Sequence, residues 1–167
     1  PPGITVSNLL ASGRRHDSRW HAESSFFEYA HSLFDPSVTW DAVSWLRSIT
    51  SLPVLLKGVL TPEDADHAVA VGAAGIVVSN HGGRQLDGAM ATMDALPAIV
   101  DRVGDRTTVL LDGGIRRGAD VLKALALGAR AVLIGRAYLW GLAAAGESGV
   151  QRVLGMLREE LELAMAL

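Results

Sequence analysis

The chain has 167 residues, of which 49% are hydrophobic, and its net charge is -3. This length and apolar content suit one ordinary domain, and the acidic balance gives no reason to expect a nucleic-acid partner. Gly, Arg and Glu interrupt the apolar segments well short of the roughly 20 residues that a membrane-spanning helix needs, so we expect no membrane span. The sequence contains no cysteine, which excludes disulfides and thiolate chemistry within it and is compatible with the cytoplasmic location that we expect.

Residues 1–50 are predicted to form a loop-rich connecting segment. They are poorly periodic and mix Ser, Arg, His and Asp with scattered Trp and Phe. One short helix is predicted over residues 39–46, with the Thr39 hydroxyl as its N-terminal cap. Four histidines have no spacing that suits a metal site, and we expect them to be solvated and the chain to bind no metal. These are His16, His21, His31 and His67.

Residues 51–167 are predicted to form four βα units. Short, nearly continuous apolar runs, which are typical of buried parallel strands, alternate with helical stretches. The predicted strands are residues 53–56, 75–78, 108–111 and 131–134. The predicted helices are residues 62–71, 92–103 and 119–127, followed by a last helix or pair of helices from residue 137 onward. The acids Glu159, Glu160 and Glu162 are expected to form a solvated face of that last segment.

Helix boundary signals and an internal repeat support these units. Thr61 precedes Pro62 and two acids in the order preferred at a helix start, and Gly72 and Gly128 are placed to end helices. An Ala-Asp pair leads to a Gly-Ala pair and a strand twice, about two βα units apart. Repeats of this kind predict an α/β fold of the TIM (β/α)8 barrel type, of which four strands are half.

Two Gly-rich turns follow the third and fourth predicted strands. The first runs Asp112-Gly113-Gly114-Ile115-Arg116, and the second is Gly135-Arg136. Such turns expose backbone N–H groups, and the loops after strands seven and eight of these barrels commonly bind phosphate. The two arginines would add charge-assisted contacts. The alternative is a pair of tight turns with surface arginines.

The Ser79-Asn80-His81-Gly82-Gly83-Arg84 segment follows the second predicted strand. An imidazole can accept a proton near neutral pH, and a guanidinium can hold a carboxylate through two parallel hydrogen bonds. His81 and Arg84 are therefore candidates for acid–base chemistry and anion binding. In the alternative, His81 only bonds its own loop and Arg84 pairs with Asp87.

Lys57 follows the first predicted apolar run. At the end of a barrel strand its ammonium group could stabilise negative charge on a bound cofactor. The alternative for this residue is a solvated lysine at a strand end.

Together these segments resemble the FMN-dependent L-2-hydroxy-acid oxidases and dehydrogenases, the family of glycolate oxidase, lactate oxidase and mandelate dehydrogenase. The resemblance rests on residues 52–59, 75–87, 109–118 and 132–136, and it extends over essentially the whole chain. It implies strands five to eight of a TIM barrel, completed by an N-terminal half outside this chain. It also implies that residues 11–36 correspond to the mobile loop over the active site.

The resemblance also implies roles for individual residues. His81 would be the catalytic base, and both His81 and Arg84 would bind the substrate, Arg84 through its carboxylate. Lys57 would lie at the N1/C2 edge of the flavin, and Ser79 would contact the flavin. The ribityl phosphate arm of FMN would be held by the two Gly-rich turns, at Asp112, Gly113, Gly114, Ile115, Arg116, Gly135 and Arg136.

The implied reaction is oxidation of an L-2-hydroxy acid, such as lactate, glycolate or mandelate, to a 2-keto acid. The implied assembly is a homo-oligomer, a tetramer in the family.

The sequence leaves two other interpretations of the function open. One is a different FMN- or phosphate-binding barrel enzyme, such as a type 2 isopentenyl diphosphate isomerase or a protein like inosine monophosphate dehydrogenase, although the latter needs a cysteine. The other is a non-catalytic fragment.

Overall fold

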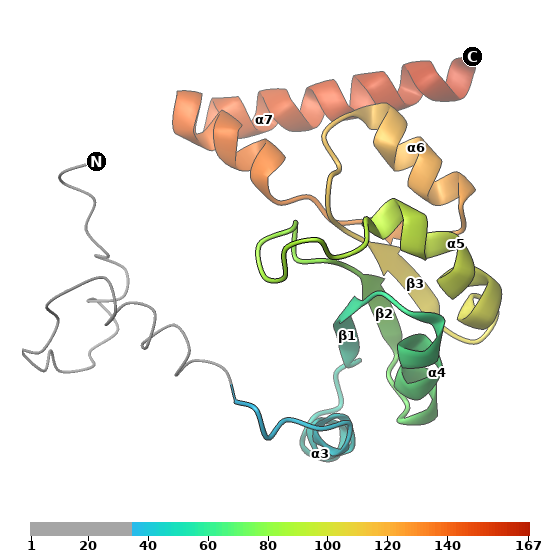
Figure 1. Cartoon of the computed structure of the whole chain (residues 1–167). Helices are drawn as coiled ribbons and strands as arrows, with labels where there is room; N and C mark the ends of the chain where they lie inside the picture. Colours follow the sequence, from blue (N-terminus) through green and yellow to red (C-terminus); the bar gives the residue numbers. More distant parts are fainter. Residues whose placement is uncertain (1–34) are drawn as a thin grey trace, which may run out of the picture. The chain divides into compact units, whose positions relative to one another are not determined.

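The structure, a computed structural model, describes residues 35–167 (Figure 1). Every helix and strand named below lies within the unit Thr39–Leu167. The predictions for the loop over the active site and for His16, His21 and His31 lie outside the described residues. Within the described range, no helix combines the length and the apolar character needed to cross a membrane.

Four parallel strands form one sheet in chain order. They are β1 (Leu55–Val59), β2 (Gly75–Val78), β3 (Thr108–Leu111) and β4 (Ala131–Val132). The sequence predicts the bounds of β2 and β3 correctly, because each is an apolar run between turn signals. β1 starts two residues later than predicted and continues through a register shift between Lys57 and Val59.

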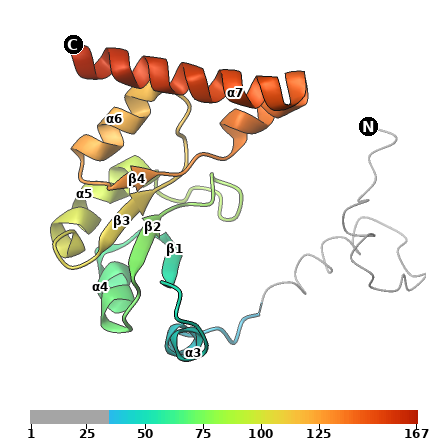
Figure 2. The same cartoon turned by 180° about the vertical axis from the view of Figure 1, so that it is seen from behind.

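Helices α4 (Pro62–Ala70), α5 (Thr92–Val103) and α6 (Gly118–Ala126) cover one face of the sheet, as the two opposite views show (Figures 1 and 2). Right-handed crossovers between parallel strands place successive helices on the same face. The core lies between these helices and alternate residues of the strands. Its fully buried members include Ile76, Val78, Leu96, Ile99, Val103, Val109 and Leu111.

The opposite face of the sheet carries the other alternate residues of each strand. Because side chains alternate along a strand, Leu55, Val77, Leu110 and Leu133 belong to this second face. Leu55 and Leu133, at the two sides of the sheet, are each 41% exposed. Within residues 35–167, β1 and β4 each have one edge without a partner strand. The described part therefore has one packed face and one face with exposed leucines at its two sides, which we call the open face, while Val77 at its centre is 4% exposed.

The helix boundaries follow the local sequence in α4 and α6 but not in α3 (Asp41–Ile49). The Thr61 hydroxyl accepts a hydrogen bond of 3.2 Å from the Asp64 amide, which confirms the predicted cap. Gly72 and Gly128 follow the last residues of α4 and α6 with φ of 80° and 99°, as predicted for helix ends. The predicted Thr39 cap is wrong, because α3 starts one residue later with Trp40 at the cap position and no side-chain cap bond.

The last helical segment, α7 (Arg136–Ala166), is broken once. Ala145 and Gly146 have non-helical backbone angles, so α7 consists of two helical parts joined by a kink. The two parts approach each other closely at Gly141 and Gly149, both of which are buried. Part of α7 also packs against α6. This arrangement fits the predicted pair of helices.

Candidate active site

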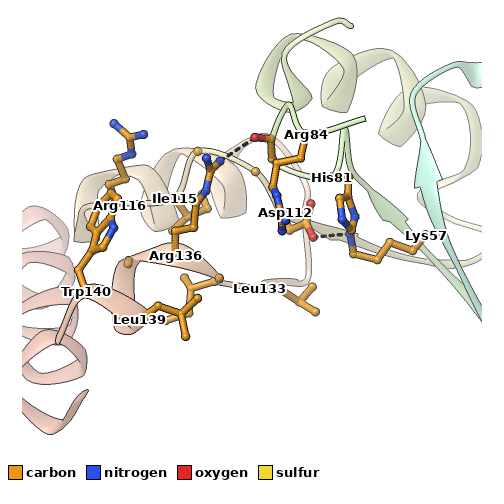
Figure 3. A pocket seen from close by; sticks show the side chains of 16 residues that line it. Lys57, His81, Arg84, Asp112, Ile115, Arg116, Leu133, Arg136, Leu139 and Trp140 are labelled. Carbon is orange, nitrogen blue, oxygen red and sulfur yellow. Dashed lines mark hydrogen bonds and ion pairs between the residues drawn. The ribbon is translucent and has the colours of Figure 1, made fainter. Parts of the chain in front are cut away.

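The carboxyl ends of the four strands surround one cavity of about 210 Å³ (Figure 3). In parallel α/β sheets, ligands bind at this end of the strands, where the loops of neighbouring βα units meet. All of the candidate site residues except Ser79 line the cavity. The lining comprises Lys57, His81, Gly82, Arg84, Asp112, Gly113, Gly114, Ile115, Arg116, Leu133, Ile134, Gly135, Arg136, Ala137, Leu139 and Trp140.

The turn that carries His81 has an unusual backbone. His81, Gly82 and Gly83 have φ values of 56°, 68° and 70°, three left-handed residues in a row. Among the described residues, His81 is the sole non-glycine residue with a positive φ. A left-handed backbone costs an ordinary residue about 1–2 kcal/mol, and such strain is concentrated at functional sites. The conformation presents the exposed imidazole at the cavity.

Hydrogen bonds fix this turn to its neighbours. Asn80 accepts from the Gly83 amide at 3.2 Å through its side chain and donates to the Met90 carbonyl at 3.3 Å. Arg136 Nη2 donates to the Gly82 carbonyl oxygen at 2.6 Å. The β2 loop that bears His81 is therefore joined directly to the first residue of α7.

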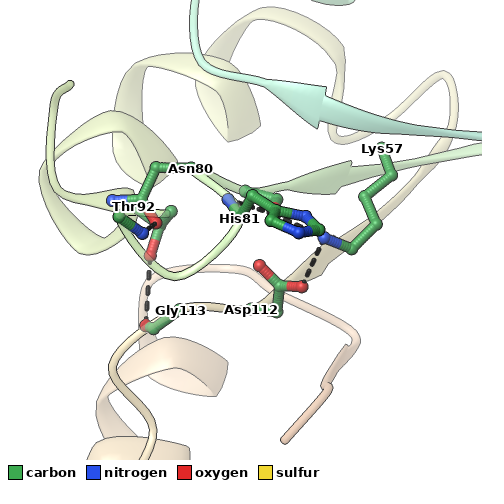
Figure 4. A network of polar contacts seen from close by, with 8 residues as sticks. Lys57, Asn80, His81, Thr92, Asp112 and Gly113 are labelled. Carbon is green, nitrogen blue, oxygen red and sulfur yellow. Dashed lines mark hydrogen bonds and ion pairs between the residues drawn. The ribbon is translucent and has the colours of Figure 1, made fainter. Parts of the chain in front are cut away.

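A second set of bonds joins the first three strands beneath the cavity (Figure 4). The Lys57 ammonium lies 2.8 Å from Asp112 Oδ2 and donates to the Ser79 hydroxyl, also at 2.8 Å. The Ser79 hydroxyl accepts a further bond of 3.1 Å from the His81 amide. Ser79 is only 1% exposed and supports Lys57 and His81 from below the cavity surface. The register shift in β1 begins at Lys57, and such irregularities often redirect a side chain near a site.

The charges around the cavity are strongly unbalanced. Four cationic side chains line it, those of Lys57, Arg84, Arg116 and Arg136, against the single carboxylate of Asp112. The chain as a whole carries a net charge of -3, so this cluster of cations is local. Concentrated positive charge in a concave site attracts an anionic ligand. Asp112 Oδ1, in addition, is a buried oxygen with no hydrogen-bond partner within the described structure.

The alternative reading of Arg84 finds no support within residues 35–167. There, none of the ion pairs joins Arg84 to Asp87, and Asp87 Oδ1 instead accepts from the Gly88 amide at 3.1 Å. The guanidinium of Arg84 is exposed at the cavity.

The two Gly-rich turns lie side by side on the cavity wall. Gly113 and Gly114 have φ of 94° and 79°, and Gly135 precedes the first turn of α7. A side chain at Gly114 or Gly135 would meet no atom within 4 Å, so there is room for a ligand against this backbone. With Arg116 and Arg136 beside it, the wall has the donors and charges that a phosphate needs. The residues present therefore fit a phosphate-bearing cofactor.

The sequence did not predict the apolar side of the cavity. Leu133, Leu139 and Trp140 line it together with the candidate residues. The guanidinium carbon of Arg116 lies 5.8 Å from the ring centre of Trp140, within range of a cation–π contact. Leu133 could have been found from the alternation within the fourth predicted strand, whereas nothing in the sequence of the last helical segment marks Trp140 as a cavity residue.

The fold and site define an α/β protein whose parallel strands present a cationic, Gly-rich cavity at their carboxyl ends. Comparison with known families identifies the group: a family model described as FMN-dependent dehydrogenase matches residues 1–167. The chain belongs to the FMN-dependent dehydrogenase family. This match favours that family over the other phosphate-binding barrels considered from the sequence.

Curated relatives match over the full chain. The chain is 53% identical over 167 residues to an L-lactate oxidase of Nostoc sp. and 58% identical over 169 residues to 2-hydroxyacid oxidase 1 of Mus musculus. Each match covers 100% of this chain but 46% of the relative. The chain therefore spans less than half the length of these relatives. A further relative, from Oryza sativa, is named as peroxisomal, so the cytoplasmic location stays a prediction.

Solved structures agree with the curated relatives. A crystal structure of mandelate oxidase with benzoyl-formic acid has a TM-score of 0.75 and 58% sequence identity, and the match covers 78% of this chain and 39% of that one. Another mandelate oxidase structure, of a mutant, contains a monooxide FMN adduct. At this identity and score, the likeness extends to the arrangement of the described helices and strands.

Proposed function

We propose that the protein carrying this chain is an FMN-dependent oxidoreductase that oxidises an L-2-hydroxy acid to a 2-keto acid. The observation that carries the proposal is that one cavity joins the His81 turn to the Gly-rich wall. There an exposed imidazole, four cationic groups and open glycine backbone line one space. Proton acceptor, carboxylate binder and phosphate binder are thus within reach of one bound cofactor and substrate.

In this proposal, His81 and Arg84 act on the substrate. The guanidinium of Arg84 holds the carboxylate of the hydroxy acid, which fixes the carbon bearing the hydroxyl group near the imidazole. His81 accepts one proton from the substrate, as a general base. The rigid left-handed turn, bonded to Arg136 through Gly82, keeps the imidazole in position and reduces the reorganisation needed during the reaction.

The remaining cavity residues are proposed to hold the cofactor. When bound, FMN supplies the acceptor for the two electrons that leave the substrate. Gly113, Gly114 and Arg116, with Gly135 and Arg136, hold its phosphate, while Asp112 and Ile115 support the first of these turns. The Lys57 ammonium places positive charge at the edge of the flavin ring. Ser79 holds this ammonium in position by accepting a hydrogen bond of 2.8 Å from it.

The substrate class rests on the relatives, which are named as oxidases of lactate, of 2-hydroxy acids and of mandelate. Within that class we assign no single acid.

We further propose that β1 to β4 are strands five to eight of a TIM barrel. The open face with Leu55 and Leu133, the unpaired edges of β1 and β4 in the described residues, and the length of the relatives support this. A companion half then completes the barrel, and a homo-oligomer, a tetramer as in the family, is the assembly to test by light scattering.

An anaerobic spectral experiment tests the function. The protein, loaded with FMN, is mixed without oxygen with lactate, glycolate or mandelate in turn. We expect at least one L-isomer to bleach the absorbance of the oxidised flavin near 450 nm, with the D-isomer as control where the acid is chiral. A protein that binds FMN but is bleached by none of these acids would contradict the oxidoreductase proposal and support a role in binding alone.

A further inference from the structure

Two adjacent arginines after the Gly-rich turn of β3 make different contacts. Arg116 lines the cavity, and its guanidinium lies over the Trp140 ring. Arg117 does not line the cavity. Its Nη2 instead donates to Glu160 Oε1 at 3.1 Å, in the second part of α7. Arg116 thus lies at the cavity, whereas Arg117 forms an ion pair within the protein.

Glu160 makes a second contact at the same place. Its Oε2 accepts a hydrogen bond of 2.9 Å from the Gly118 amide, the first N–H of α6. The bond from Gly118 and the ion pair with Arg117 hold the pKa of Glu160 below its usual range, so this carboxylate is ionised near neutral pH. An acidic group at a helix start is stabilised by the helix dipole as well. Our expectation that Glu160 is simply a solvated acid is therefore incomplete, because its side chain is 34% exposed but both carboxylate oxygens accept hydrogen bonds.

A second carboxylate completes the start of α6. Asp120 Oδ2 accepts from the amides of both Arg116 and Arg117, each at 3.0 Å. The free N–H groups of a helix start would otherwise attract an anion directly after a Gly-rich turn. Here Asp120 and Glu160 already bind the amides of Arg116, Arg117 and Gly118. A phosphate in the cavity is consequently left to the glycine backbone, the Arg116 side chain and the start of α7.

The packing of α7 against this turn is close. A side chain at Gly118, which is buried, would overlap the backbone of Glu160 and Leu161. The carboxylate of Glu160 thus lies on a backbone that contacts the turn directly, and it has little freedom to adopt another position. Arg117 and Gly118 are fixed by a residue 42 or 43 positions later in the sequence.

We propose that Glu160 is a positioning residue for the phosphate end of the cofactor site. By binding Arg117 and the start of α6, it fixes the turn so that Arg116 faces the cavity and Gly114 keeps its open backbone. This inference rests on the proposed function, because it assumes that the turn holds the phosphate of FMN. Glu160 touches neither cofactor nor substrate and acts through the turn.

The test compares FMN with riboflavin, which lacks the phosphate. Both flavins are titrated into the full-length apoprotein by fluorescence quenching, for the parent, Glu160→Gln and Glu159→Gln. Glu159 is the exposed neighbour and serves as the control. We expect Glu160→Gln to weaken FMN binding about tenfold, the lower end of what one hydrogen bond to a charged group contributes, with riboflavin affinity unchanged. The Glu159 variant should bind both flavins like the parent.

Two results would overturn the inference: unchanged FMN affinity in Glu160→Gln, or equal losses for FMN and riboflavin, which would indicate general loosening. If Glu160→Gln does not fold, Arg117→Met decides in the same titration. The Arg117 side chain is 74% exposed, and the Arg117→Met variant retains the hydrogen bond from the Gly118 amide to Glu160. We therefore expect a smaller loss of affinity, for FMN alone. No loss of FMN affinity would contradict the inference. A parent that binds neither flavin would refute the proposed function itself, and the inference would fall with it.

Discussion

Arg136, the first residue of α7, donates a hydrogen bond of 2.6 Å from Nη2 to the carbonyl oxygen of Gly82, 54 residues earlier. A side chain at Gly82 would approach this guanidinium to 2.8 Å, so the contact leaves little space there. One cationic group therefore serves the turn that bears His81 and the wall proposed to hold phosphate. Disturbing it should affect both the cofactor and the imidazole.

Replacement of Arg136 by Met should weaken FMN binding by about tenfold or more, because hydrogen bonds to charged groups contribute roughly 1.5–3 kcal/mol. Riboflavin should be much less affected. Flavin titration measures both, and Arg130→Met, an exposed arginine that does not line the cavity, is the control. Equal FMN affinity in the Arg136 and Arg130 variants would argue against a phosphate contact.

Replacement of His81 by Gln should leave FMN bound while the rate of anaerobic flavin reduction falls by at least about 100-fold, the lower range for loss of a general base. Stopped-flow absorbance with the best hydroxy acid measures this rate. His67→Gln is the matched control, since His67 lies on α4 and its ring packs edge-on against Trp40 at 5.5 Å between centroids. Reduction at the parent rate would remove His81 from the role of base.

The backbone strain at His81 predicts an order of stability among substitutions. Asn tolerates the left-handed region, so His81→Asn should unfold at nearly the same denaturant concentration as the parent. Val is β-branched and stiff, so His81→Val should lose about 1–2 kcal/mol more, although the site is exposed and buries little. Urea unfolding compares the two variants. Equal stabilities would show that φ at this position relaxes freely.

The Lys57–Asp112 pair should show coupling in a double-mutant cycle. Lys57→Met alone leaves the Asp112 carboxylate, 18% exposed, without its cation and with Oδ1 already lacking a partner. We expect a loss of about 1–3 kcal/mol in the free energy of unfolding. Adding Asp112→Asn removes the uncompensated charge, so the double variant should recover part of this loss. Strictly additive effects in urea unfolding would contradict the coupling.

Asp66 predicts a loss of stability in acid. Its carboxylate contacts Arg102 Nε and lies 2.7 Å from Arg106 Nη1, which joins α4 to the end of α5 and the turn that follows it. The bond from Arg106 and then that from Arg102 lower the pKa of Asp66 below its ordinary value. The folded state therefore holds this proton less tightly than the unfolded state does. The resulting stability is present above about pH 4 and is lost as the pH falls through the lowered value.

Asp66→Asn removes the titrating group and should flatten this part of the stability curve. Melting temperatures measured between pH 2 and pH 6 test the point, with Asp101→Asn as an exposed acidic control on the same helix pair. The parent and the Asp101 variant should lose stability together in acid, whereas the Asp66 variant should start lower and change less. Parallel curves for all three would mean that Asp66 contributes nothing to the dependence.

Local sequence predicted the parts of the fold that depend on local forces. The strands at residues 75–78 and 108–111 are apolar runs between turn residues, and α5 covers the predicted residues 92–103. β1 differs because its irregularity at Gly58, where φ is 104°, depends on pairing with β2. The start of α3 differs because a Thr at the right spacing is no guarantee that its hydroxyl turns toward the helix.

The site, like the fold, has features that local sequence predicts and features that depend on tertiary packing. Polar residues that follow predicted strands could be assigned to one cavity, because parallel strands end at the same edge of a sheet. Ser79 follows β2 at this edge, but it is buried beneath Lys57 and His81 and does not line the cavity, so its predicted flavin contact stays a prediction. Glu160 could not be recognised, since its partners are more than 40 residues away and nothing in an acidic helix segment marks one carboxylate as bound. Its role depends on where the kink in α7 directs the chain.

Within residues 35–167, β1 and β4 each have one edge without a partner strand, so the stability of this part depends on what else binds to it. Each of these edges has backbone donors and acceptors that another strand can pair with, and an exposed leucine, Leu55 or Leu133, lies beside it. A melting curve recorded on the chain by itself would accordingly shift with protein concentration, or on addition of the complementary strands. The measured melting temperature would then depend on the interface between these edges and their partner strands as much as on the packing within the described residues.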